Sequence, residues 1–87
     1  MIDTSHKPAL SRLFRMQWEP AQDAYVLLYP EGMVKLSQSA AEILKRCDGK
    51  NTADMIVTEL EQAFSSTGLH DDIHAFLNEA TTRGWFV

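Results

Sequence analysis

The sequence has 87 residues, 45% of them hydrophobic and 23% charged, and its formal net charge is −4 at pH 7. A chain of this length forms one domain with one modest core. The acidic balance argues against nucleic acid as a partner, and no apolar run approaches the roughly 18 residues that a membrane span needs, so we expect no membrane contact.

Cys47 is the only cysteine, so the chain forms neither an internal disulfide nor a cysteine-based zinc site. We expect this thiol to pack as a small apolar side chain. The first eight residues lack the apolar segment of a signal peptide. These features are typical of a cytoplasmic protein.

The N-terminal residues 1–11 are polar and contain Pro8, which predicts a flexible arm in front of a single domain of residues 12–87. After Arg12, hydrophobic residues occur at every second position, which is the period of a half-buried strand. The residues on this face are Phe14, Met16 and Trp18. Residues 19–23 then break the pattern, as the connection of a β-hairpin does.

Two further strands follow, and the second of them is short. Residues 24–29 are rich in aromatic and aliphatic side chains, which favour a strand. Pro30 and Gly32 then favour a tight turn. The segment Met33–Leu36 is too short for a central strand, so we expect an edge strand whose unpaired backbone groups another chain can use.

The second half of the chain has the periodicity of three helices. Ser37 or Ser39 caps the first helix, with Ser39 and Glu42 at capping-box spacing, and Asn51 or Thr52 caps the second. The three apolar stripes are Ala40, Ile43, Leu44 and Cys47; Ala53, Ile56, Val57, Leu60 and Phe64; and Leu69, Ile73, Phe76, Leu77 and Ala80.

Three strands followed by three helices predict an α+β fold. We expect a three-stranded antiparallel meander that packs on the helices in a winged helix-turn-helix-like arrangement. This arrangement leaves a DNA-binding winged helix as an alternative function. A recognition helix needs cations to meet phosphates, however, and the third helix has Asp71, Asp72 and Glu79 against Arg83 alone. The charge distribution therefore disfavours nucleic acid.

The two histidines His70 and His74 are the candidates for metal chemistry. Their spacing is that of the zinc-protease helix motif, with aspartate in place of the glutamate base. A metal site needs a third ligand, and the remaining histidine, His6, lies in the predicted arm. We interpret His70 and His74 as residues at the rim of the apolar stripe. We predict no catalytic residue, no metal and no cofactor, and hence no enzyme.

An ordered set of segments carries a more specific signal. The segments are Phe14–Glu19, Val26–Leu36, Ser39–Leu44 with Cys47–Gly49, and Gly84–Trp85. In this order they closely resemble the PqqD family of pyrroloquinoline quinone biosynthesis, and the likeness extends from about His6 to the end of the chain. Phe86 stands where the family favours leucine, which is a small departure.

The resemblance implies a non-catalytic precursor-peptide recognition domain with a winged-helix-like fold. Such a domain binds the leader of the peptide PqqA and presents PqqA to the radical S-adenosylmethionine enzyme PqqE. In the wider family the leader pairs with the third strand and lies beside the third helix. The corresponding residues of this sequence are Met33, Val34, Lys35 and Leu36 on the strand, and Ile73, Phe76, Leu77 and Ala80 on the helix.

Some of these residues have a second interpretation. About three or four backbone hydrogen bonds contribute roughly 0.5–1.5 kcal/mol each, which falls short of the about 8 kcal/mol of micromolar binding, so the leader must also bury apolar side chains. Ile73, Phe76 and Leu77 either supply that surface or complete the core. Lys35 either contacts an acidic leader or protects the edge strand from aggregation. The chain is a monomer or a homodimer that exchanges the hairpin before Pro30.

Overall fold

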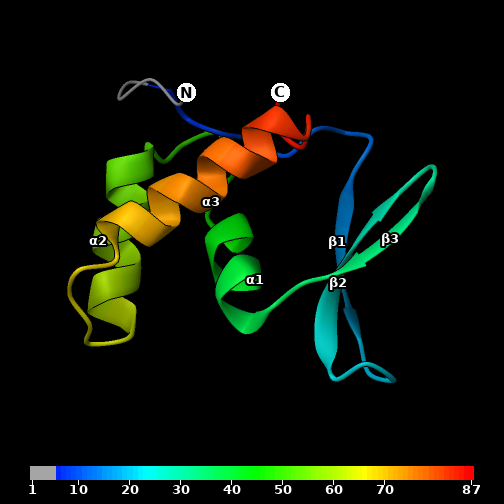
Figure 1. Cartoon of the computed structure of the whole chain (residues 1–87), viewed down its shortest axis with the longest axis horizontal. Helices are drawn as coiled ribbons and strands as arrows, with labels where there is room; N and C mark the ends of the chain where they lie inside the picture. Colours follow the sequence, from blue (N-terminus) through cyan, green and yellow to red (C-terminus); the bar gives the residue numbers. More distant parts are fainter. Residues whose placement is uncertain (1–5) are drawn as a thin grey trace.

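The computed structural model describes residues 6–87, which form three strands followed by three helices (Figure 1). The strands are β1 (Arg15–Glu19), β2 (Ala24–Tyr29) and β3 (Gly32–Lys35), and the helices are α1 (Gln38–Lys45), α2 (Ala53–Ala63) and α3 (His70–Thr82). The sheet is antiparallel, with the strands in the order β1-β2-β3. The α+β arrangement of a meander and three helices is therefore confirmed.

The inner face of the sheet follows from its register. Leu27 in the middle of β2 lies between Met16 of β1 and Val34 of β3, and it is fully buried. At one end of the same face, the rings of Trp18 and Tyr25 meet edge to face at 5.2 Å. These alternate apolar positions form the sheet face that packs on the helices, and Val26 on the opposite face of β2 is fully buried as well.

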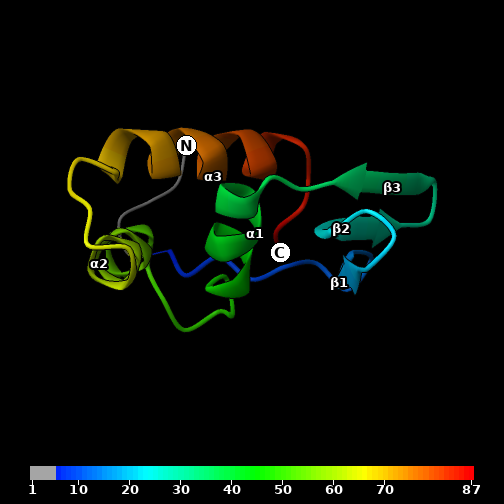
Figure 2. The same ribbon diagram turned by 90° about the horizontal axis from the view of Figure 1, so that it is seen from below.

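The three helices cover this face in a defined order. Helix α1 stands beside β2, α2 lies on the far side of α1 from the sheet, and α3 runs across α1 from the side of α2 toward the sheet (Figure 2). The fully buried side chains Leu27, Ile56 and Leu77 come from β2, α2 and α3. The core therefore joins the sheet to the other two helices through α1, whose buried residues are Ala40, Ala41, Ile43 and Leu44.

Side chains cap the first two helices. Ser37 Oγ accepts a hydrogen bond from the Ala40 N–H at 3.1 Å, and Thr52 Oγ1 accepts one from the Met55 N–H at 3.2 Å. The capping-box pairing of Ser39 with Glu42 does not form. The Glu42 carboxylate instead accepts hydrogen bonds from Lys45 and Arg46 on the next turn, where an i,i+3 and an i,i+4 partner lie within reach.

The segment before β1 corrects the expectation of a loose arm. The Pro8 ring is fully buried, and the Gly49 N–H donates to the Pro8 carbonyl at 3.0 Å. Ala9 and Leu10 form isolated bridges with Asp48 and Phe86. An apolar ring and paired backbone groups thus fix residues 8–11 to the domain. The first five residues of the predicted arm lie outside the described residues.

No helix within residues 6–87 combines the length and the apolar character that crossing a membrane requires.

Candidate functional site

The sheet has two edge strands, β1 and β3, and the sequence-based expectation concerns the outer edge of β3. The Leu36 N–H donates to the Tyr25 carbonyl at 2.9 Å, so this pair is hydrogen-bonded. Bonded and non-bonded pairs alternate in an antiparallel ladder, so Val34 is also bonded to its partner Leu27. The backbone groups of Met33 and Lys35 then point away from β2. Each of these two residues offers an N–H and a C=O to an added strand.

The side chains of the same segment divide between the two faces of the sheet. Leu36 is buried in the core, and Val34 packs against the core. Met33 and Lys35 lie on the opposite face, and Met33 is 49% exposed. The side chains of Val34 and Leu36 therefore hold this segment to the core. Met33 and Lys35 have exposed side chains and backbone groups that point away from β2.

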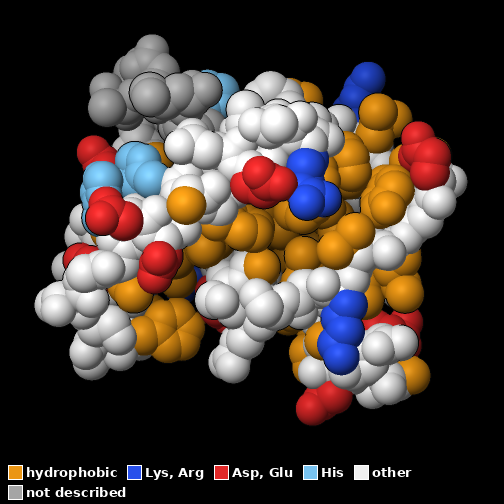
Figure 3. Space-filling view, viewed as in Figure 1, with side chains coloured by type: hydrophobic (Ala, Val, Ile, Leu, Met, Phe, Trp, Pro, Cys, Tyr) orange, Lys and Arg blue, Asp and Glu red, His pale blue; other side chains and the backbone are white. Residues whose placement is uncertain are grey.

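The free edge of β3 and helix α3 border the same face of the molecule. In Figure 2, β3 lies at the level of α3, with β2 and β1 beneath it. Hydrophobic side chains gather over the middle of this face, between α3 and the sheet (Figure 3). A peptide that pairs with β3 on this side meets apolar surface rather than solvent alone.

A hollow of about 570 Å³ continues this face between the start of α1, the end of α2 and the first half of α3. It begins at Ser37, directly after the end of the β3 segment. Its apolar lining is made by Ala40, Ile43, Leu60, Phe64, Leu69, Ile73 and Phe76. The size and lining suit one or two apolar side chains of a bound peptide.

The four predicted residues of α3 fall into two groups. Ile73 and Phe76 line the hollow, although Ile73 is 4% exposed and Phe76 half-buried. Leu77 and Ala80 are at most 1% exposed and belong to the core. Helical phase explains this division, because Leu77 and Ala80 turn toward α2 and the sheet while Phe76 faces outward.

Aromatic rings connect α3 to the sheet beneath this face. Phe76 and Trp85 lie 6.2 Å apart between ring centroids, Trp85 and Phe14 lie 6.4 Å apart, and Phe14 and Tyr29 lie 5.6 Å apart. All four side chains are half-buried. We call these residues the aromatic row. It extends from α3 to the end of β2, next to Gly32, where β3 begins.

Of the aromatic row, sequence reasoning assigned only Phe76 to the site, and it did not assign Phe64. Phe64 was expected in the apolar stripe of the second helix, but it is the C-cap residue of α2, 49% exposed at the hollow. Phe14 and Trp85 lie 71 positions apart in the numbering, so no local pattern joins them. The available signal was compositional: both are large aromatic residues at the ends of elements rather than within them.

The charged residues that line the hollow are two carboxylates, Glu42 of α1 and Asp72 of α3. Glu42 pairs with Arg46 at 3.0 Å and Lys45 at 3.2 Å. The hydrogen bond from Arg46 holds the pKa of the Glu42 carboxyl below its usual range, although partial burial opposes the shift. The carboxylate is thus ionised at neutral pH but already has cationic partners.

Comparison with known proteins places this architecture in a family. The family model described as Coenzyme PQQ synthesis protein D (PqqD) matches residues 24–85. The chain belongs to the PqqD family. The match begins at the start of β2 and ends at Trp85, so it includes β3, α3 and most of the aromatic row.

Several PqqD-family relatives match nearly the whole chain. A Pseudomonas aeruginosa protein named PqqA binding protein is 53% identical over 79 residues, which are 90% of this chain and 86% of the relative. A Methylococcus capsulatus protein of the same name is 47% identical over 76 residues, which are 87% of this chain and 82% of the relative. Both relatives are small proteins of similar length.

A solved PqqD structure has the same fold. The solution structure of the PqqD truncation of Methylobacterium extorquens PqqCD aligns with a TM-score of 0.83 and 27% identity, covering 100% of this chain and 95% of that one. That domain is described as a functional and stand-alone RiPP recognition element, where RiPP denotes a ribosomally synthesised and post-translationally modified peptide.

Two histidines and an aspartate, residue types that can ligate metals, meet elsewhere on this PqqD-family chain. Asp54 at the start of α2 lies beside His70 and His74 of α3. The sequence indicated no third residue of a metal-ligating type beside the histidine pair, and the structure places Asp54 of α2 there. A helical pattern does not reveal which turn of one helix packs against another.

Proposed function

We propose that this chain is a peptide chaperone of pyrroloquinoline quinone biosynthesis. It binds the precursor peptide PqqA through its leader and presents PqqA to the radical S-adenosylmethionine enzyme PqqE. Relatives named PqqA binding protein and a PqqD neighbour described as a recognition element support this proposal. The observation that carries it is the free edge of β3, which lies next to an apolar hollow on the same face.

In this proposal the leader adds a strand to β3. Met33 and Lys35 each donate one hydrogen bond to the leader backbone and accept another from it, which sets the register of the peptide. Such hydrogen bonds contribute roughly 0.5–1.5 kcal/mol each, so a few of them do not reach the about 8 kcal/mol of micromolar binding. Buried leader side chains supply the rest.

The apolar surface beside β3 provides that contribution. A leader strand that continues past Leu36 reaches the hollow at Ser37, where Ile73 and Phe76 form part of the lining. An apolar residue of the leader that enters the hollow contributes about 1.5–3 kcal/mol. Alternate residues of a strand point to one side, so the spacing of apolar leader residues selects the peptide.

Lys35 gives the site a positive charge beside the free edge. Its side chain is exposed and lies on the same face of the sheet as that of Met33. An acidic residue of the leader opposite Lys35 gains an ion pair of up to about 1 kcal/mol, which added salt screens. The charge therefore favours one register of an acidic leader without providing much of the affinity.

The function is tested by titrating the purified chain with PqqA peptide, and with a PqqA peptide that lacks the leader. The proposal expects saturable binding of the first peptide and a large loss of affinity for the second. The absence of saturable binding, both alone and with PqqE present, contradicts the proposal. Equal affinity for the two peptides contradicts the role of the leader.

Presentation to PqqE needs its own experiment. Immobilised PqqE is incubated with labelled PqqA, with and without the chain, and the retained peptide is measured. The proposal expects the chain to increase the amount of PqqA that PqqE retains and the rate at which PqqE modifies PqqA. If both quantities are the same without the chain, it binds PqqA for another purpose.

A further inference from the structure

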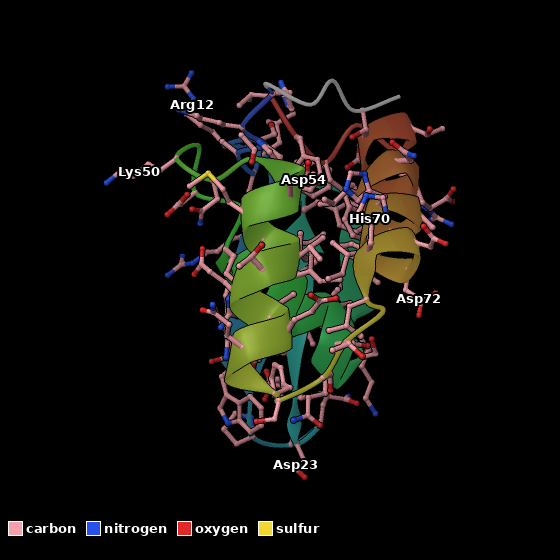
Figure 4. The ribbon with its side chains drawn as sticks, turned by 90° about the vertical axis from the view of Figure 1, so that its left-hand side faces the viewer. Arg12, Asp23, Lys50, Asp54, His70 and Asp72 are labelled. Atoms are coloured by element: carbon pink, nitrogen blue, oxygen red, sulfur yellow. The ribbon has the colours of Figure 1, made fainter. Side chains whose placement is uncertain are left out.

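Three metal-ligating side chains converge on the outer side of α2 and α3. Asp54 lies in the first turn of α2, and His70 and His74 lie one turn apart at the start of α3. Their ligand atoms all lie within 4.8 Å of one another. The side chains of Asp54 and His70 point toward one another from the two helices, whereas Asp72 points away (Figure 4).

The two imidazoles are already oriented around the carboxylate. His74 Nε2 lies 3.1 Å from Asp54 Oδ1, and His70 Nε2 lies 3.7 Å from the same oxygen. The two rings stack with a centroid distance of 4.1 Å and an interplanar angle of 23°. Both Nε2 atoms therefore lie beside the same carboxylate oxygen, and a turn of the near-parallel rings brings their lone pairs onto one ion.

A second carboxylate supports His70 from behind. His70 Nδ1 lies 3.1 Å from Asp71 Oδ1, on the side of the ring opposite to Nε2. A histidine that ligates a metal through one nitrogen commonly donates the other N–H to a carboxylate, which fixes the tautomer and the ring orientation. Asp71 has this position, so the cluster contains an outer carboxylate as well as its three ligands.

We propose that Asp54, His70 and His74 form a binding site for a divalent transition-metal ion of the Zn²⁺, Ni²⁺ or Cu²⁺ type. Two imidazole nitrogens and one carboxylate oxygen suit these ions, whereas Mg²⁺ and Ca²⁺ select sites made of oxygen alone. The three side chains leave further coordination positions open to solvent or to a partner.

Closing the site requires only side-chain rotation. Metal–ligand bonds of about 2.0–2.2 Å place the ligand atoms of a tetrahedral site about 3.3–3.6 Å apart, closer than the 4.8 Å within which these atoms lie. The side chains of Asp54 and His70 are 62% and 60% exposed, so they have room to turn inward. His74 is more buried, with a side-chain exposure of 22%, and is the fixed member of the set.

A bound ion joins the first turn of α2 to the first turns of α3. Ile73, between the two histidines in sequence, lines the apolar hollow on another side of the same helix. The ion therefore restrains the half of α3 that forms a wall of the hollow. This inference rests on the side-chain cluster alone and stands whether or not the chain binds PqqA.

The test uses the full chain after chelator treatment, titrated calorimetrically with Zn²⁺ and with Ni²⁺. The site predicts saturable binding of one ion per chain and a melting temperature that rises with the concentration of the ion. His74→Ala and Asp54→Asn each lower the affinity by more than about tenfold, since even outer partners of metal ligands are worth roughly 10–100-fold. Far-UV circular dichroism without metal shows whether each variant folds.

His6→Ala is the matched control, because His6 is the one histidine outside the cluster. The His6→Ala variant binds both ions with the same affinity as the unaltered chain. The inference is overturned if the unaltered chain shows no saturable binding of either ion. It is also overturned if binding survives in the His74→Ala and Asp54→Asn variants, or if His6→Ala weakens it as much as they do.

Discussion

The neighbouring residues Phe76 and Leu77 of α3 have different roles, and replacing each with alanine distinguishes peptide binding from stability. Phe76 lines the hollow and is half-buried, whereas Leu77 is fully buried in the core. We expect Phe76→Ala to weaken PqqA binding by roughly 1–3 kcal/mol with a smaller loss of stability. Leu77→Ala lowers the free energy of unfolding by about 2–5 kcal/mol. Peptide titration and urea unfolding of both variants measure the two effects.

The decisive measurement is the difference in PqqA affinity between Phe76→Ala and Leu77→Ala. If Phe76→Ala binds PqqA as tightly as the unaltered chain does, Phe76 belongs to the core and the leader does not use this part of the hollow. Leu77→Ala, where it remains folded, keeps its peptide affinity, because its side chain does not reach the surface.

Cys47 makes stability depend on pH above neutrality. The thiol is 5% exposed, and burial raises its pKa from 9.0 to about 12, with a smaller contribution from Asp48. The unfolded chain loses this proton first as the pH rises. The contribution of the Cys47 thiol to the free energy of unfolding is therefore fully present below pH 9.0 and is lost between pH 9.0 and about 12.

We expect the free energy of unfolding to fall by at most about 1.4 kcal/mol per pH unit through this window because of Cys47. Urea unfolding of the unaltered chain and of Cys47→Ala at a series of pH values measures it. The difference between the two curves isolates the thiol, since both chains share every lysine and tyrosine. Curves that stay parallel above pH 9.0 show that Cys47 titrates as an exposed thiol does.

At the scale of elements, one edge of β3 is hydrogen-bonded to β2, and the other edge has backbone groups that can pair with a partner strand. Lys35→Pro removes an N–H that points away from β2, where proline is tolerated in an edge strand. We expect this variant to fold and to lose affinity for PqqA. Val34→Pro removes an N–H that bonds to β2, so it damages the sheet itself. Peptide titration and far-UV circular dichroism distinguish the two outcomes.

Lys35→Thr is the matched control for the backbone effect, because it removes the charge and keeps the N–H. It retains most of the affinity at moderate salt. If Lys35→Thr and Lys35→Pro lose affinity equally, the side chain rather than the backbone of Lys35 contacts the leader.

The elements themselves were largely predictable from sequence, because their signals are local. Period-two alternation marked β1, and a run of aromatic and aliphatic residues marked β2. Ser37 and Thr52 marked the starts of α1 and α2 among the predicted alternatives. The prediction of a flexible arm is wrong from Pro8 onward, because the Pro8 ring is buried and its carbonyl accepts a hydrogen bond from Gly49, which is distant in sequence.

The site was predictable only in part, for the same physical reason. The short third strand was visible as an edge, because its length and the preceding turn are local features. The pairing of Phe14 with Trp85, and of Asp54 with His74, depends on how whole elements pack. Periodicity indicates which side of a helix is apolar but not which residue of another helix lies opposite.

At the scale of the whole molecule, residues near the two ends of the described chain hold the sheet and helices together. The Ser11 N–H donates to the Trp85 carbonyl at 2.8 Å, and the Val87 N–H donates to the Ala9 carbonyl at 2.9 Å. The Trp85 ring lies between Phe14 before β1 and Phe76 of α3. The Trp85 side chain therefore supports both α3 and the sheet, the two elements that border the proposed binding face for PqqA.

We expect Trp85→Ala to lower the free energy of unfolding by about 2–4 kcal/mol and to weaken PqqA binding as well. Trp18→Ala is the control, because Trp18 is 46% exposed and contacts Tyr25 on the sheet. That variant loses no more than about 1.5 kcal/mol. Guanidinium unfolding followed by far-UV circular dichroism measures both. If Trp85→Ala and Trp18→Ala lose the same free energy of unfolding, the aromatic row does not link α3 to the sheet.

The central claim is that PqqA adds a strand to the free edge of β3, and amide hydrogen exchange tests it most directly. The account predicts that exchange at the Met33 and Lys35 amides slows strongly when PqqA peptide is added, while the Val34 amide, already bonded to β2, changes little. Binding of the peptide with unchanged exchange at Met33 and Lys35, or with new protection confined to β1, contradicts the account.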